Sequence, residues 1–148
     1  MSTLQATNLK HNASVSNNIT LDASGNAAVA GTLSFNSGFG SSSVAYGCRA
    51  WVNFNGTGTV AIRASGNVSS ITDIDVGRYN VNFSAAMPDA GYCVTLGAGL
   101  TAGGGSDTNY NLLDANFSRT TSAVRVGFFT SSGTAYADTP NFDVAIFR

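Results

Sequence analysis

From about residue 47 onward, short runs of alternating apolar and polar residues cover most of the chain, and Gly and Asn interrupt them at regular intervals. A period of two places successive side chains on opposite faces of a β-strand. The alternation predicts strands at 47–54, 58–64, 68–73, 78–84, 91–97, 110–118, 122–130 and 141–147. Asn55-Gly56 is a strong hairpin signal between two of them. No helical period intervenes, so the sequence predicts an all-β antiparallel fold.

Strands at this spacing predict a jelly-roll-like β-sandwich over residues 44–148, with a closed barrel as the alternative. Alternation assigns four triplets to the core: Tyr79, Val81 and Phe83; Tyr92, Val94 and Leu96; Val124, Val126 and Phe128; Phe142, Val144 and Ile146. The strand at 47–54 is apolar on both faces, because Ala50 and Val52 oppose Trp51. Such a strand lies centrally or against another subunit. Trp51 is therefore interpreted as a core or interface residue, with sugar stacking as the competing interpretation.

The first 35 residues differ from the rest and predict a short β stalk. Ile19 and Leu21 alternate with polar residues, a turn is expected at 22–26, and the alternation resumes at Val29. An isolated hairpin is marginally stable, so we expect three copies of the chain to share the stalk core in a homotrimer. The Gly/Ser-rich segment 36–43 is predicted to be a linker between stalk and sandwich.

Composition narrows the class of protein further. The 148 residues are 43% hydrophobic and 10% charged, with no Glu and a single Lys. Short uncharged polar side chains suit tight strands and surfaces that are buried against other subunits. The net charge of −1 and the scattered Arg residues give no reason to expect nucleic acid. No apolar run approaches the ~20 residues of a membrane span, and the N-terminus lacks the pattern of a signal peptide.

Catalytic and metal-binding signatures are weak. The single His, His11, lies in the predicted stalk, which disfavours Ser-His or Cys-His nucleophilic chemistry. Asp73 and Asp75 are the carboxylate pair considered for glycoside hydrolysis or Ca²⁺ binding, but such a pair is more typical of a solvated turn. Gly103–Gly105 lacks the Gly-Lys-Ser/Thr of a phosphate loop. We therefore expect no enzyme activity, no cofactor and no metal.

Cys48 and Cys93 are the only cysteines. In a chain without a signal peptide, two cysteines are interpreted as small buried apolar residues rather than as a disulfide.

Three segments carry a family resemblance: Cys48-Arg-Ala-Trp-Val-Asn-Phe54, Gly58-Thr-Val-Ala-Ile-Arg-Ala-Ser-Gly-Asn67, and Tyr79-x-Val-Asn-Phe83 with Ala86-Met-Pro88 and Tyr92-x-Val94. Together they resemble the C-terminal domains of bacteriophage tail-fibre proteins, particularly those of marine and cyanobacterial phages. Phe83-x-x-x-Met-Pro-x-x-x-Tyr-x-Val94 is more distantly similar to the trimeric, sugar-binding sandwiches of H-type lectins.

The resemblance implies a virion fibre or fibre-tip protein, made in the host cytoplasm, that forms a homotrimer, adheres to a host-surface receptor and contacts other tail proteins. We expect the receptor to be a glycan. The alternative is a purely structural decoration or tail accessory protein without a ligand. Loops on a rigid sandwich are the usual place for binding groups. Six loop residues with sugar-compatible side chains are the candidate receptor contacts: Asp107, Asn109, Tyr110, Ser132, Tyr136 and Asp138.

Overall fold

The computed structural model describes residues 6–35, 43–44, 47–99, 110–113, 119–129 and 135–148. All regular structure in these residues is β-strand in antiparallel pairs, which confirms the all-β prediction. The chain divides into two compact units, Met1–Tyr46 and Gly47–Arg148, and each is described by itself.

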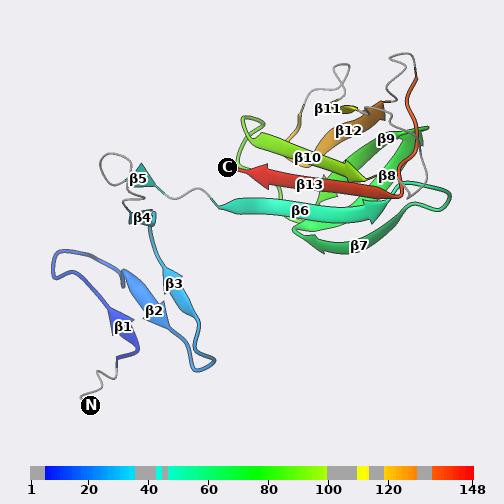
Figure 1. Cartoon of the computed structure of the whole chain (residues 1–148). Helices are drawn as coiled ribbons and strands as arrows, with labels where there is room; N and C mark the ends of the chain where they lie inside the picture. The colour runs from blue at the N-terminus through cyan, green and yellow to red at the C-terminus, as the bar shows by residue number, and fades with distance from the viewer. Residues whose placement is uncertain (1–5, 36–42, 45–46, 100–109, 114–118, 130–134) are drawn as a thin grey trace. The chain divides into compact units, whose positions relative to one another are not determined.

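The second unit contains two four-stranded sheets (Figure 1). The first sheet has the order β10-β13-β6-β7, built from Cys93–Gly99, Asn141–Phe147, Cys48–Asn55 and Ala61–Gly66. The second sheet has the order β11-β12-β9-β8, built from Tyr110–Leu113, Ala123–Phe129, Arg78–Phe83 and Val68–Asp75. The C-terminal strand β13 thus lies between two strands that are far from each other in sequence.

Aromatic side chains from the two sheets meet in one core. The rings of Phe54 and Tyr79 lie 5.1 Å apart edge to face, and those of Phe128 and Phe142 lie 6.5 Å apart. Because each pair joins one sheet to the other, the two sheets pack face to face as a β-sandwich. The predicted core triplets lie in this layer.

Two of the predicted core residues, Val94 and Leu96, are only partly buried, because β10 is an edge strand of its sheet. The core also contains residues outside the triplets, among them Val68, Met87 and the fully buried Thr139. Thr139 is polar, but its hydroxyl donates a hydrogen bond to the carbonyl oxygen of residue 99 at 2.8 Å, which satisfies the buried group.

The first hairpin of the sandwich differs from the two-residue turn that Asn55-Gly56 predicts. The connection spans residues 56–60, and β7 starts at Ala61 rather than near residue 58. The Gly56 N–H bonds to the Thr139 carbonyl at 2.9 Å, so Gly56 belongs to the end of the core rather than to a free turn. The Asn55 side chain holds the following loop by donating to the Thr57 carbonyl at 2.7 Å.

Cys48 and Cys93 are free thiols, but both are exposed, so the prediction that they are buried is wrong. Both pair with Phe147 of β13, one from each side, and all three share the outer face of the first sheet. Alternation with the core residue Val94 already points Cys93 outward. Cys48 has the same parity as the buried Ala50, and the register shift between Ile146 and Phe147 turns it outward instead. Two strand spacings of ~4.8 Å separate them, which is beyond the reach of a disulfide.

The first unit contains a three-stranded sheet of order β1-β2-β3, formed by Asn8–Leu9, Ile19–Leu21 and Ala27–Val29. A second pair joins β4, Ser34–Phe35, to β5, Ser43–Val44. The predicted turn at 22–26 is present. Asp22 Oδ1 accepts hydrogen bonds from the backbone N–H groups of Ser24 (2.9 Å) and Asn26 (2.8 Å), and Gly25 has φ +84°. Hydrogen bonds lower the pKa of the Asp22 carboxyl, and the bond from the Asn26 side chain makes the largest contribution.

Candidate functional site

The three-stranded sheet of the first unit has one apolar face. The register places five side chains on that face: Leu9, Ile19, Leu21, Ala27 and Val29. The opposite face carries Asn8, Thr20 and Ala28. Leu9, Leu21 and Val29 remain 45%, 40% and 45% exposed, and no described residue of this unit is buried. The sheet is therefore amphipathic, and nothing within this unit covers its apolar face.

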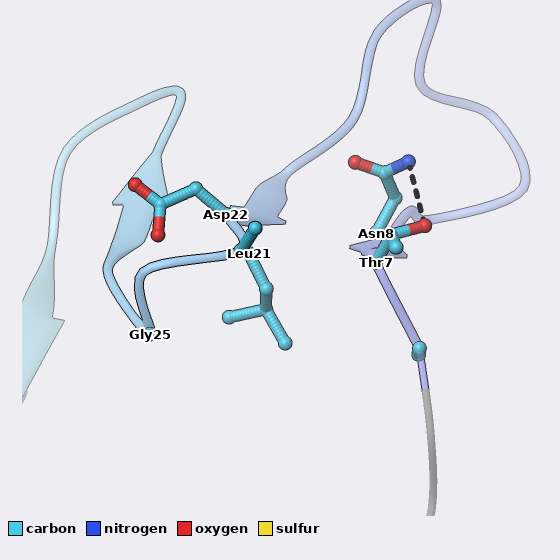
Figure 2. A pocket seen from close by; sticks show the side chains of 7 residues that line it. Thr7, Asn8, Leu21, Asp22 and Gly25 are labelled. Carbon is cyan, nitrogen blue, oxygen red and sulfur yellow. Dashed lines mark hydrogen bonds between the residues drawn. The ribbon is translucent and has the colours of Figure 1, made fainter.

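A hollow of about 950 Å³ opens at the edge of this sheet, between the 22–25 turn and the strand that carries Thr7 and Asn8 (Figure 2). The Leu21 side chain extends toward this space, whereas the Asp22 side chain points away from it. The lining contains the Thr7 hydroxyl and the Asp22 carboxylate but no His, Lys or Arg that could activate them or pair with them, so the hollow suits apolar contact better than chemistry.

Of the six predicted receptor residues, the structure describes Tyr110, Tyr136 and Asp138. Asp107, Asn109 and Ser132 lie outside the described residues. Tyr110 begins β11 and pairs with Phe129, but its side chain is not among those described. Only the Tyr136 and Asp138 side chains can be located.

Tyr136 is half-buried on the outer face of the second sheet. Its ring lies over Gly127, edge to face with Phe129 at 4.8 Å, and the Arg78 guanidinium carbon lies 5.1 Å from the ring centroid. A Cβ on Gly127 would approach the Tyr136 ring to 2.9 Å, so the glycine makes room for it. Tyr136 is thus anchored to the sheet and still partly open to solvent.

The Asp138 side chain is hydrogen-bonded to other residues of the sandwich. Its Oδ1 accepts a hydrogen bond from the Gly77 N–H at 2.7 Å and lies 2.9 Å from the hydroxyl of the fully buried Tyr79. The Tyr79 hydroxyl is also 2.9 Å from the Gly56 carbonyl oxygen, and its one proton serves one acceptor at a time. Burial, together with the hydrogen bond to Asp138 and its charge, raises the pKa of Tyr79 well above its usual value.

Gly77 fits closely beneath the segment that carries Asp138. It has φ +64°, and a Cβ there would lie 2.3 Å from the carbonyl oxygen of Ala137. Gly77 and Asp138 therefore act together as a latch that fastens residues 135–139 to the sandwich.

Asp73, Asp75 and Asp138 line one hollow of about 300 Å³ near this latch. The Asp75 carboxylate accepts a hydrogen bond from the next backbone N–H, that of Val76, at 2.8 Å, as in a solvated turn. Within the described ranges, no group of three or more His, Cys, Asp or Glu residues has an arrangement that could hold a metal ion.

Trp51 is 45% exposed on the outer face of the first sheet, so the prediction that it lies in the core is wrong. The pairing register puts Thr95, Ala145, Trp51 and Gly66 in one row across the four strands. A depression of about 360 Å³ lies beside Trp51, bounded by Thr95, Gly97 and Asp143. Ala145 on β13 and Gly97 on the edge strand β10 have little or no side chain, which keeps this depression open.

A chain of polar groups borders the depression. Asn53 donates a hydrogen bond to Asp143 Oδ1 at 2.7 Å. Arg63 donates to Asn53 Oδ1 at 3.4 Å and to the Pro140 carbonyl at 2.6 Å, which fixes the orientation of the amide. None of the described residues donates a hydrogen bond to Asp143 Oδ2, which is therefore open as an acceptor. The outer face of the second sheet differs, because its polar side chains bond to one another. Arg125 donates a hydrogen bond to Asn80 at 3.0 Å, and Asn82 donates one to Thr72 at 2.8 Å.

The sequence analysis considered Trp51 but missed Thr95, Gly97 and Ala145 beside it. The sequence does contain a signal for an open surface here, because these three occupy outward positions of their strands and two of them are among the smallest residues. The register that brings them next to Trp51 joins segments about 50 and 90 positions away, which alternation within one strand does not reveal.

None of the described residues forms a helix long and apolar enough to cross a membrane. Comparisons with protein-family models, with curated proteins and with solved structures found no match to this chain.

Proposed function

We propose that the chain is a bacteriophage fibre or fibre-tip protein: a homotrimer that is joined through its N-terminal unit and adheres through its sandwich to a glycan on the host surface. The uncovered apolar face of the β1-β2-β3 sheet is the observation that carries the proposal. An oligomerisation segment joined to a rigid sandwich is the arrangement that an adhesive fibre end needs.

The energetics of the first unit favour assembly. Ordering a residue costs ~1–2 kcal/mol of backbone entropy, whereas no described side chain of this unit is buried to offset that cost. Fully burying one Leu or Val contributes ~1.5–3 kcal/mol. Three copies that turn Leu9, Leu21 and Val29 toward a common axis would supply this burial, and the unit by itself does not.

The oligomeric state tests the first half of the proposal. We expect the full chain to have a trimeric mass by light scattering at micromolar concentration. Leu21→Asp with Val29→Asp places charges on the apolar face and should give a monomer. Asn8→Asp with Ala28→Asp is the matched control, because it adds the same two charges to the opposite face and should leave the trimer intact. A wild-type monomer, or a double variant that stays trimeric, contradicts the proposal.

Attachment tests the second half. The labelled full chain is applied to an array of bacterial surface polysaccharides and to a panel of intact bacteria. Binding to at least one polysaccharide, stronger for the trimer than for the monomeric variant because of avidity, is the expected result. A trimer that binds no polysaccharide and no cell would support the structural decoration protein instead.

A further inference from the structure

We propose that the depression beside Trp51 binds one neutral hexopyranose ring of a glycan, with the apolar face of the sugar stacked on the indole. This inference rests on the proposed function and supplies its ligand site. It places the site on the outer face of the first sheet rather than in the loops where the sequence had predicted it.

Trp51 provides a fixed platform. It lies in the middle of β6, between two hydrogen-bonded neighbour strands, and almost half of its surface is open. A Cβ on Gly66 would lie 2.4 Å from Trp51 Nε1, so the indole rests directly on the backbone of β7. A ring supported in this way loses little freedom when a sugar stacks on it, which favours binding.

The depression has a suitable size and shape. Its volume of about 360 Å³ lies within the ~300–1,000 Å³ of small-molecule sites. Ala145 forms its floor next to Trp51, and Thr95 stands on the far side, so a ring that rests on the indole has room beside it.

Polar groups at the rim match sugar hydroxyls. Asp143 Oδ2 is an open acceptor on a carboxylate that Asn53 already holds in place through Oδ1. A carboxylate that accepts hydrogen bonds from hydroxyls forms short, strong bonds. Its negative charge also repels acidic sugars, whereas a neutral hexose meets no such repulsion, and this difference is the reason that a neutral hexose is specified.

A second copy of the chain is the competing occupant of this face. Such a contact would bury the Asp143 carboxylate, and removing a charge from water without a cationic partner is costly. Hydroxyl groups of a sugar, in contrast, replace the lost water. The observations therefore favour the sugar.

Fluorescence provides a direct test, because Trp51 is the only Trp in the protein. The full chain is titrated with neutral hexoses and, in parallel, with hexuronic acids. We expect a saturable change in emission with neutral hexoses, with a Kd of about 1 mM, and binding at least tenfold weaker for the acids. Ala145→Leu fills the depression and should abolish the change. Ala61→Leu, on the same sheet outside the depression, is the matched control and should retain it.

Three results overturn the site: no saturable change with any neutral hexose, an equal change in Ala145→Leu, or shielding of Trp51 from acrylamide in the sugar-free protein. The last would show that another copy covers the face. Attachment to the polysaccharide array separates this inference from the proposed function. If wild type and Ala145→Leu attach equally well, the site is wrong and the function stands. If wild type titrates with hexoses but attaches to nothing, the site stands and the function is wrong.

Discussion

The hydroxyl of Tyr79 joins the sandwich core to the segment that carries Asp138, and its removal should destabilise the protein measurably. Tyr79→Phe deletes a group that lies 2.9 Å from both Asp138 Oδ1 and the Gly56 carbonyl oxygen. A hydrogen bond to a charged group contributes ~1.5–3 kcal/mol, and the Gly56 oxygen would lose its side-chain donor. We expect a loss of about 2 kcal/mol in the free energy of unfolding.

A double-mutant cycle isolates the contact itself. Asp138→Ala also removes the bond to the Gly77 N–H, but Asp138 is exposed, so we expect about 1–2 kcal/mol for it alone. Because the two side chains share one hydrogen bond, the double variant should lose about 1 kcal/mol less than the sum of the single losses. Tyr92→Phe is the control partner, because its hydroxyl bonds to the Thr120 carbonyl at 3.0 Å, and its effect should add to that of Asp138→Ala.

The free energy of unfolding of each variant is measured by urea unfolding of the full chain, followed by Trp51 fluorescence at one fixed protein concentration. The concentration must be held constant because assembly shifts apparent stability. Losses for Tyr79→Phe and Asp138→Ala that add within ~0.3 kcal/mol would refute the contact between the Tyr79 hydroxyl and Asp138.

Three further predictions concern the sandwich. The pKa of Tyr79 is higher in the folded protein than in the unfolded chain, where it is about 10. The stabilisation that this difference provides is complete below pH 10, so the free energy of unfolding should fall as the pH rises above 10. Tyr79→Phe should flatten that part of a profile of melting temperature against pH. Gly77→Ala should lower the melting temperature clearly more than Gly58→Ala, because both have positive φ but only Gly77 faces a close backbone oxygen, and equal shifts would contradict the fit described above. Cys48 and Cys93 should both react with a thiol reagent in the native protein, and replacing either by Ser should leave the melting temperature nearly unchanged; unreactive thiols would show that another surface covers them.

The fold class followed from the sequence because alternation is a local property. Tyr79, Val81 and Phe83 point to one side of their strand whatever the rest of the chain does, and apolar side chains on one side must be buried. The same reasoning predicted a strand at 141–147, and β13 begins and ends at these two residues. The turn at 22–26 was also predictable, since the Asp22 side chain reaches only the next few backbone N–H groups.

Pairing between distant strands is what the sequence left open. Whether Cys48 points inward depends on its register against Phe147, and a shift of one residue would reverse the face. Asp138 was a plausible receptor residue until the fold placed it against Tyr79, 59 positions away. The depression beside Trp51 likewise exists only because Ala145 and Thr95 arrive from other strands. Alternation along one strand determines which side chains share a face, whereas tertiary pairing alone decides which faces and which neighbours they meet.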